Sequence, residues 1–310
     1  MPMIKYIGVD LCKLELVADL AAEAKPRAFP NDVSGHAALI AALPKGAHLI
    51  CESTGGYQRA LVAALHAAEV PVSVVSPSRV RHFALAKGLR AKTDPIDARL
   101  LSVFGEAMAC VALPVPSAEA LELQALVRAR QVLHTQLNEE SSHDEHCTIP
   151  FLLEQAAARR TLLHEQIRAI ERRLRALIAA NPFWRARSER VQEVSGIGEV
   201  SAWIVLAELP ELGQLAPGQA GALLGVAPDP NESGPRHGAR HISGGRSHAR
   251  KVFYMAALTA SRHNSVLAPF YLRLTQQHHK HHRVALTAVM RKLVELLNRL
   301  LADPNFILAP

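Results

Sequence analysis

Near its start the chain reads Tyr6-Ile-Gly-Val-Asp10, a short apolar run that ends in a carboxylate. A second run of the same kind, Leu49-Ile-Cys-Glu52, follows further along. Runs this short and this apolar predict buried strands of an α/β sheet. An acid at the end of such a strand lies at the edge of the sheet, where α/β proteins place their sites.

Two further acids, Asp94 and Asp97, lie in the segment Lys92-Thr-Asp-Pro-Ile-Asp-Ala-Arg99. Their i, i+3 spacing puts them on one face if Pro95 opens a helix. Four carboxylates brought together would repel one another unless cations neutralise them, and hard oxygen ligands suit Mg²⁺. Two such ions about 4 Å apart polarise a phosphodiester and activate its nucleophile. The alternative is that these acids are ordinary caps and solvated strand ends.

The motifs around these acids resemble the amino-terminal domain of one transposase family, the IS110 insertion-sequence family, which also includes Piv-type DNA invertases. They are, in order, Gly8-Val-Asp-Leu-Cys-Lys13, Cys51-Glu-Ser-Thr-Gly-Gly-Tyr57 and the Lys92–Arg99 segment. The resemblance implies a RuvC-like domain with an RNase H fold and an Asp-Glu-Asp-Asp set that is catalytic and binds Mg²⁺. Carried over residue by residue, that set is Asp10, Glu52, Asp94 and Asp97.

Composition favours a nucleic-acid partner in a reducing compartment. The 310 residues are 49% hydrophobic and carry a net charge of +7, which suggests a polyanion. The four cysteines show no spacing typical of zinc sites or disulfides. The first five residues lack a signal-peptide layout, and no apolar run reaches membrane-spanning length. We therefore expect a cytoplasmic, nucleoid-associated protein with no membrane partner.

The charge is unevenly distributed. From Ser233 to Val294 there is no Asp or Glu, while eleven Lys or Arg and eight of the sixteen His residues fall in that span. This predicts a face or groove built for phosphates, the alternative being chance and a solvated basic helix. Within it, the His-rich segment Gln276–Arg283 departs from the Gly/Lys-rich loop usual in the family, and we interpret it as a partly protonated phosphate-binding loop.

Three parts are expected along the chain. Strands are predicted at 4–9, 14–20, 48–52 and 71–76, and helices at 35–43, 57–68, 78–86 and 95–109. A Pro-rich break at 113–117 precedes leucine spacings that predict two long helices packed as a coiled-coil hairpin, interrupted by the acidic stretch 139–145 and Pro150. The predicted domains are a RuvC-like domain at 1–114, a self-associating arm at 115–181, and a mainly α transposase domain at 182–310.

The third part contains Val194-Ser-Gly-Ile-Gly-Glu-Val-Ser-Ala202, which resembles a helix-hairpin-helix element. In such an element the glycines, here Gly196 and Gly198, allow a tight turn. The following helix then offers backbone N–H groups to a DNA phosphate. The alternative is a plain turn between two packed helices.

A second chemical centre is predicted around Ser233, in a Gly-containing loop near several arginines. Guanidiniums can hold a scissile phosphate and stabilise its developing charge while the loop lets the hydroxyl approach in line. Ser-Gly pairs are also common turn formers, so a structural role is the alternative. The residues expected to contact nucleic acid are Gly196, Gly198, Arg236, Arg240, Arg246, Arg250 and Lys251.

This region resembles the carboxy-terminal transposase domain of the same family. In that domain the nucleophilic serine occupies the Ser-Gly position after an Ala-Pro turn, which here is Ser233. Ser243 is the competing hydroxyl, for which we expect a structural or phosphate-contact role. The matching stretches are Gly196–Gly198, Leu224–Pro228, Glu232–Gly234, Ile242–Arg246, Tyr254–Ala257 and Val289–Leu293.

The resemblance implies a DNA transposase or site-specific recombinase that cuts and rejoins strands through a covalent phosphoserine link. It also implies double-stranded donor and target DNA, a structured bridge RNA as guide, and a homodimer that assembles to a tetramer on DNA. There, the acids of one subunit meet the serine of another. Two rivals stay open. One is a Piv-like invertase or RuvC-like junction nuclease that does not need the serine, and the other is a non-catalytic nucleic-acid-binding protein.

Overall fold

The computed structural model describes residues 4–20, 25–53, 55–89, 94–144, 147–229, 232–233, 236–238 and 240–308. The chain divides into two units, Met1–Pro116 and Ser117–Pro310. The predicted division into three domains stays a prediction.

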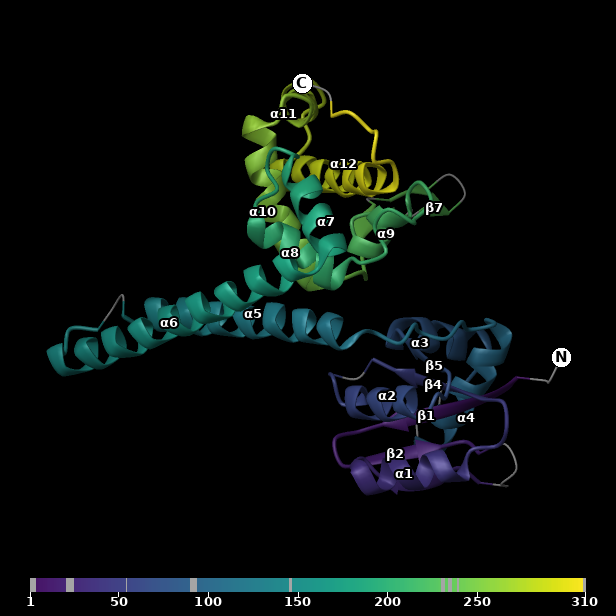
Figure 1. Cartoon of the computed structure of the whole chain (residues 1–310). Coiled ribbons are helices and arrows are strands. Elements are labelled where there is room, and N and C mark those ends of the chain that lie inside the picture. The colour runs from purple at the N-terminus through teal and green to yellow at the C-terminus, as the bar shows by residue number, and fades with distance from the viewer. Residues whose placement is uncertain are drawn as a thin grey trace. The chain divides into compact units, whose positions relative to one another are not determined.

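The first unit is built on a five-stranded mixed sheet with helices packed against it (Figure 1). The strand order is β3-β2-β1-β4-β5, in which β1, β4 and β5 are parallel and β2 is antiparallel to both of its neighbours. The predicted α/β character is confirmed. The strands are β1 (Lys5–Leu11), β2 (Glu15–Ala18), β3 (Arg27–Pro30), β4 (Ala47–Glu52) and β5 (Val72–Val75).

Strand β3 was not predicted from the sequence. It has four residues, of which only Phe29 is buried, so it lacks the apolar run that marked the other strands. The four helices of this unit match the predicted ones to within a few residues. They are α1 (Val33–Ala42), α2 (Gln58–Ala67), α3 (Pro77–Ala86) and α4 (Asp94–Ala107).

The two faces of the sheet are covered by different helices. Ile7 and Val9 of β1 belong to a core that includes Leu39 of α1 and Leu61 of α2. On the other face, α4 packs along β1, and Phe104 lies in a second core with residues of β4 and α3. Because strand side chains alternate, successive residues of β1 serve these two cores in turn.

Helix α4 crosses β1 at Gly8, where the two backbones almost touch. A Cβ at Gly8 would lie 2.0 Å from the carbonyl oxygen of Ala98 and 2.5 Å from the amide nitrogen of Ser102. The Gly8 amide also donates a hydrogen bond of 2.7 Å to the hydroxyl of Ser102. Only glycine permits this approach, so Gly8 sets the position of α4 over the strand.

The second unit begins with two long antiparallel helices, α5 (Ala118–Asp144) and α6 (Pro150–Ala180), which lie side by side in Figure 1. Ion pairs join them along their length, among them Arg173 to Glu122 at 2.6 Å and Arg130 to Glu171 at 2.8 Å. The two predicted long helices are confirmed. Helix α5 continues through most of the acidic stretch, to Asp144, so the interruption lies later than the start of that stretch, and Pro150 opens α6 as its first residue.

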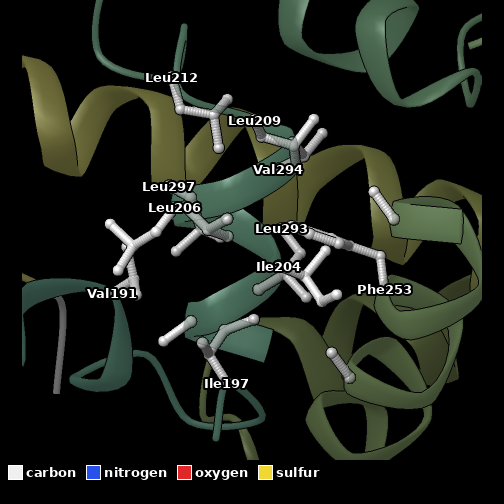
Figure 2. Packing of buried hydrophobic residues seen from close by; sticks show 14 of the residues in the cluster. Val191, Ile197, Ile204, Leu206, Leu209, Leu212, Phe253, Leu293, Val294 and Leu297 are labelled. Carbon is white, nitrogen blue, oxygen red and sulfur yellow. The ribbon is translucent and has the colours of Figure 1, made fainter. Parts of the chain in front are cut away.

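The rest of this unit is mainly helical. Trp203 and Ile204 of α8 are buried in its core with residues of α10 and α12, and Figure 2 shows Ile204 lying with Leu293 and Phe253. The N-terminal part of α5 and the C-terminal part of α6 contribute to the same core, for example through Leu123 and Leu174. The elements are α7 (Pro182–Gln192), α8 (Glu199–Glu208), α9 (Gln219–Leu224), β6 (Pro228–Asp229), β7 (Glu232–Ser233), β8 (Arg236–His237), β9 (His241–Ile242), α10 (Ser247–His263), α11 (Leu267–Leu272), the π-helix η1 (Arg273–Gln277) and α12 (His282–Ala302).

None of the helices in the described part of the chain is long and apolar enough to cross a membrane.

We predict that Gly8→Ala destabilises the first unit by roughly 3 kcal/mol, because the added methyl group would force α4 away from β1. Urea denaturation followed by circular dichroism would measure the loss. Gly198→Ala is the matched control, since a Cβ there meets no atom within 4 Å. Equal stability of the two variants would contradict the tight crossing at Gly8.

Candidate functional site

Asp10 and Glu52 lie on adjacent parallel strands at the same end of the sheet. Val9 of β1 is paired with Cys51 of β4, so the next residue of each strand is the acid. Val9 and Cys51 both face the core formed with α1 and α2. By alternation, Asp10 and Glu52 are on the opposite face, the one that α4 covers. Both are half-buried.

Asp97 approaches the same place from α4. It precedes Ala98, whose carbonyl oxygen lies against Gly8, two residues before Asp10 in β1. Asp97 is also half-buried. Asp94 is the first residue of α4, one turn before Asp97, and its side chain lies outside the described residues. The structure thus brings three of the four predicted acids to one end of one face of the sheet.

The metal site itself stays a prediction. Among the described side chains, which do not include that of Asp94, no three His, Cys, Asp or Glu gather closely enough to hold a metal ion. The donor types nevertheless suit a hard divalent cation, because carboxylate oxygens are what Mg²⁺ prefers.

Cys51 is excluded from the chemistry of this site. Burial is the main cause that raises the pKa of the Cys51 thiol to about 12, and the negative charge of Glu52 adds to it. The Cys51 side chain also faces the core formed with α1 and α2, on the opposite face of the sheet from Asp10 and Glu52. Oxygen ligands are therefore the only ones that β4 offers at this end.

In the second unit, Ser233 lies in a short antiparallel pair. Strand β7 pairs with β8, with Ser233 opposite Arg236, and β6 pairs with β9 outside it. In Figure 1 this segment extends from the helical body beside α9. The backbone therefore pairs the predicted nucleophile with one of the predicted phosphate-binding arginines. Their side chains lie outside the described part of the chain.

The Ile242–Arg246 loop closes against the end of α9. Gly244 and Gly245 both have positive φ, and a Cβ at Gly245 would lie 2.2 Å from the amide nitrogen of Gly225. The Nη1 atom of Arg250 donates to the carbonyl oxygens of Gly244 at 2.6 Å and of Gly225 at 3.2 Å. These glycines and Arg250 form a structural clasp, which leaves Ser243 exposed beside it.

Arg246 is also engaged inside the protein. Its guanidinium donates to both carboxylate oxygens of Glu211, one of them at 2.6 Å, and to the carbonyl oxygen of Glu208. Burial alone would raise the pKa of Glu211, but hydrogen bonds and charge from Arg246 outweigh it and lower that pKa. Arg246 therefore has an acidic partner that the sequence did not suggest, because Glu211 lies outside the acid-free window.

The other cations predicted to contact phosphate differ in what the structure describes of them. Arg240 and Lys251 are exposed, whereas the side chain of Arg236 lies outside the described residues. A role in nucleic-acid binding stays a prediction for all of them. Of the cations in this set whose side chains are described, Arg240 and Lys251 are the two at the surface.

The stretch predicted to be a helix-hairpin-helix element forms the turn between α7 and α8. Gly196 has a φ of +106°, and a Cβ there would lie 2.8 Å from the Cβ of Ala260 in α10, so its packing accounts for the glycine. Gly198 caps α8 and faces open space. Glu199, in the first turn of α8, accepts two hydrogen bonds from Arg175 at 2.7 and 2.8 Å. The carboxylate of Glu199 therefore lies near the N-terminus of α8, where the motif would place a DNA phosphate.

The His-rich segment follows the π-helix η1. His278, His279 and His281 are exposed, and the Tyr271 hydroxyl and His282 Nδ1 are hydrogen-bonded at 2.7 Å. The interpretation as a phosphate-binding loop stays a prediction.

Comparisons with known proteins give consistent matches along the chain. A family model described as a transposase, of the Asp-Glu-Asp-Asp type of IS110, matches residues 7–146, and the model of the transposase IS116/IS110/IS902 family matches residues 188–272. The chain is 24% identical over 302 residues to the pilin gene-inverting protein of Moraxella bovis, covering 94% of each chain. It is 24% identical over 252 residues to that of Moraxella lacunata, covering 80% of this chain and 78% of the other.

We predict that Arg246→Gln destabilises the second unit by roughly 1 kcal/mol at neutral pH, because Glu211 loses its partner in a half-buried position. Since folding lowers the pKa of Glu211, the contribution of the pair is complete above the ordinary pKa of a glutamate and is lost as pH falls through the lowered value. Urea denaturation of wild type and Arg246→Gln would test this, because their free energies of unfolding should differ at neutral pH and become similar at acid pH.

Lys251→Gln serves as the control for Arg246→Gln, because it removes a neighbouring exposed charge that has no ion pair among the described side chains. If Arg246→Gln keeps full stability but weakens DNA binding, Arg246 is a phosphate ligand and the internal role assigned to it is wrong.

Proposed function

The chain belongs to the IS110 family of transposases and is an enzyme of DNA recombination or transposition, and we propose that it cuts and rejoins DNA with a metal-binding acid set and a serine nucleophile. The single observation that best supports this is the placement of Asp10 and Glu52. They occupy equivalent positions on the neighbouring parallel strands β1 and β4, on the face that Asp97 approaches. The mixed sheet that carries them is compatible with the RuvC-like fold that we propose for this unit.

The acid set would hold Mg²⁺ through Asp10, Glu52, Asp94 and Asp97. Bound there, the ion would polarise the phosphodiester and lower the pKa of an attacking hydroxyl. The crossing at Gly8 would keep the acid of α4 in place against the acids of the sheet. The carboxylates themselves would remain ionised ligands and undergo no covalent change.

Ser233 would attack the scissile phosphorus. A bond forms between the serine oxygen and phosphorus, the bond from phosphorus to one sugar oxygen breaks, and that oxygen leaves as a hydroxyl with a proton. Attack by a sugar hydroxyl of another strand end then reverses these changes and releases the serine. Each transesterification conserves the bond energy, so no ATP is consumed. The pairing of Ser233 with Arg236 supports this role, because a guanidinium can hold the phosphate.

The serine needs an activator, since its hydroxyl is barely ionised at neutral pH. We propose that the metal-bound acid set of another subunit supplies it, in a homodimer that assembles to a tetramer on donor and target DNA. We further propose a structured bridge RNA that pairs with both DNAs. Pairing would then supply sequence recognition, and the basic surface would bind backbones.

Site-specific inversion of a DNA segment is a second candidate. The pilin gene-inverting protein of Moraxella bovis aligns with 94% of this chain, so inversion and transposition on the same scaffold are both consistent with the match. The two reactions share their chemistry and differ in the DNA sites that are joined. The DNA flanking the reading frame would distinguish them, because element ends and a structured non-coding segment indicate transposition.

We predict that Asp10→Asn lowers strand transfer by roughly 1,000-fold, the equivalent of about 4 kcal/mol, because the metal ions lose a charged ligand. The fold should remain, since a half-buried strand-end acid contributes little to stability. Joined products would be measured on DNA and RNA taken from the sequence flanking the reading frame, with thermal melting as the check on folding. Near-normal transfer by a folded Asp10→Asn protein would remove the acids from the mechanism.

We predict that Ser233→Ala binds nucleic acid normally but forms no covalent protein–DNA adduct, whereas Ser243→Ala retains adducts. Adducts would be detected as labelled DNA that stays with the protein through denaturing electrophoresis. Mixing Asp10→Asn with Ser233→Ala should restore some adduct if the acids and the serine act from different subunits. Adducts at normal yield from Ser233→Ala would show that the serine is dispensable, as in the junction-nuclease alternative.

A further inference from the structure

Positive charge without any acid is concentrated in the sequence that contains helix α3, between Glu69 and Asp94. Between Glu69 and Asp94 the sequence has no acid, and five of the twelve Lys and Arg residues of 1–116 lie there. The remainder of 1–116 carries seven Lys or Arg and ten acids, a net negative charge. A polyanion that approaches the acid set would therefore be repelled unless this segment offsets the charge. The five are Arg79, Arg81, Lys87, Arg90 and Lys92.

Helix α3 leaves the sheet from the end at which the acids lie. Val75, the last residue of β5, is paired with Glu52 in the parallel register, and the Ser53 amide donates to the Val75 carbonyl oxygen at 3.0 Å. Helix α3 begins at Pro77, two residues later. Its first turn therefore starts beside the strand that carries Glu52.

Helix α3 packs against the first unit through a narrow strip of apolar side chains, and the rest of its surface is accessible to solvent. Val80 is its one buried residue, and the ring of Phe83 meets that of Phe104 edge-on, with centroids 5.3 Å apart. Arg79 lies over the Phe104 ring at 5.7 Å, and Lys87 over Phe83 at the same distance. These contacts hold the cations at the flanks of the strip, and no carboxylate among the described side chains forms an ion pair with them.

Arg81 lies on the outward face of α3, together with His82. Both are exposed, as is Lys87, and within the described residues neither Arg81 nor Lys87 forms an ion pair with a carboxylate. A helix face that serves only solubility would be expected to carry both positive and negative side chains. Helix α3 carries positive charge alone.

We propose that the exposed cations of α3 and its C-terminal cap, Arg81 and Lys87 foremost, bind the phosphodiester backbone of the DNA that enters the acid site. This inference rests on the proposed function, because it places the DNA beside the acids. Each phosphate contact releases counterions, so the plot of log affinity against log salt has a negative slope, and the loss of one contact lowers the magnitude of this salt slope by about 0.9. Helix α3 would thus draw the strand toward carboxylates that would otherwise repel it.

The test measures binding of the full chain to a labelled DNA duplex from the flanking sequence, by fluorescence anisotropy across a salt series and with EDTA present. For Arg81→Gln/Lys87→Gln we expect the salt slope to fall by about 2 and the affinity to fall by about tenfold at moderate salt. The matched control is Lys5→Gln/Lys45→Gln, which removes the same charge from exposed positions at the start of β1 and just before β4, at the opposite end of the sheet. Its affinity should stay within twofold of wild type.

An unchanged salt slope in Arg81→Gln/Lys87→Gln, with an unchanged melting temperature, would overturn the inference. So would an equal loss in the control, which would show a general effect of net charge. A loss confined to a structured RNA probe of equal length would assign α3 to RNA and also overturn it. Because binding in EDTA requires no chemistry, a chain that binds as expected but joins no strands would count against the proposed function alone.

Discussion

The contact between Gly8 and α4 is the constraint on which the acid site depends. A helix that crosses a strand normally stands off by the depth of its side chains, but here the Ala98 carbonyl oxygen lies where a Cβ of residue 8 would be. The Ser102 hydroxyl fixes the crossing further by accepting from the Gly8 amide. Since Asp97 precedes Ala98 and Asp10 follows Gly8 by two residues, one backbone contact positions acids from distant parts of the sequence.

The basic stretch of the second unit shows how charge serves both folding and binding. Arg246 and Arg250 use their guanidiniums within the protein, one on Glu211 and the other on two carbonyl oxygens of the glycine clasp. Arginine suits this work because its planar fork donates several hydrogen bonds in fixed directions. The same window exposes Lys251 and Arg240. A run without acids therefore combines cations that are engaged inside the protein with cations that are exposed at its surface.

The two units divide the tasks that the proposed chemistry requires. The first presents carboxylates at the end of a rigid sheet, and the second carries the serine on a short strand pair supported by the clasp between Gly225 and Gly245. A serine that depends on acids of another subunit would be inactive until the complex forms on DNA. Such an arrangement would restrict cutting to assembled complexes, in which the cut ends can be rejoined at once.

The sequence by itself determined the strands that carry Asp10 and Glu52, the long helices α5 and α6, and the family, because apolar periodicity and local motifs are written in consecutive residues. Strand β3 could not be predicted, since its pairing with β2 stabilises it more than its own apolar content. Only the tertiary structure decided that Arg246 meets Glu211 and that Gly196 packs on α10. Such partners lie far along the chain, and a motif read in isolation cannot show whether folding has already occupied its charged groups.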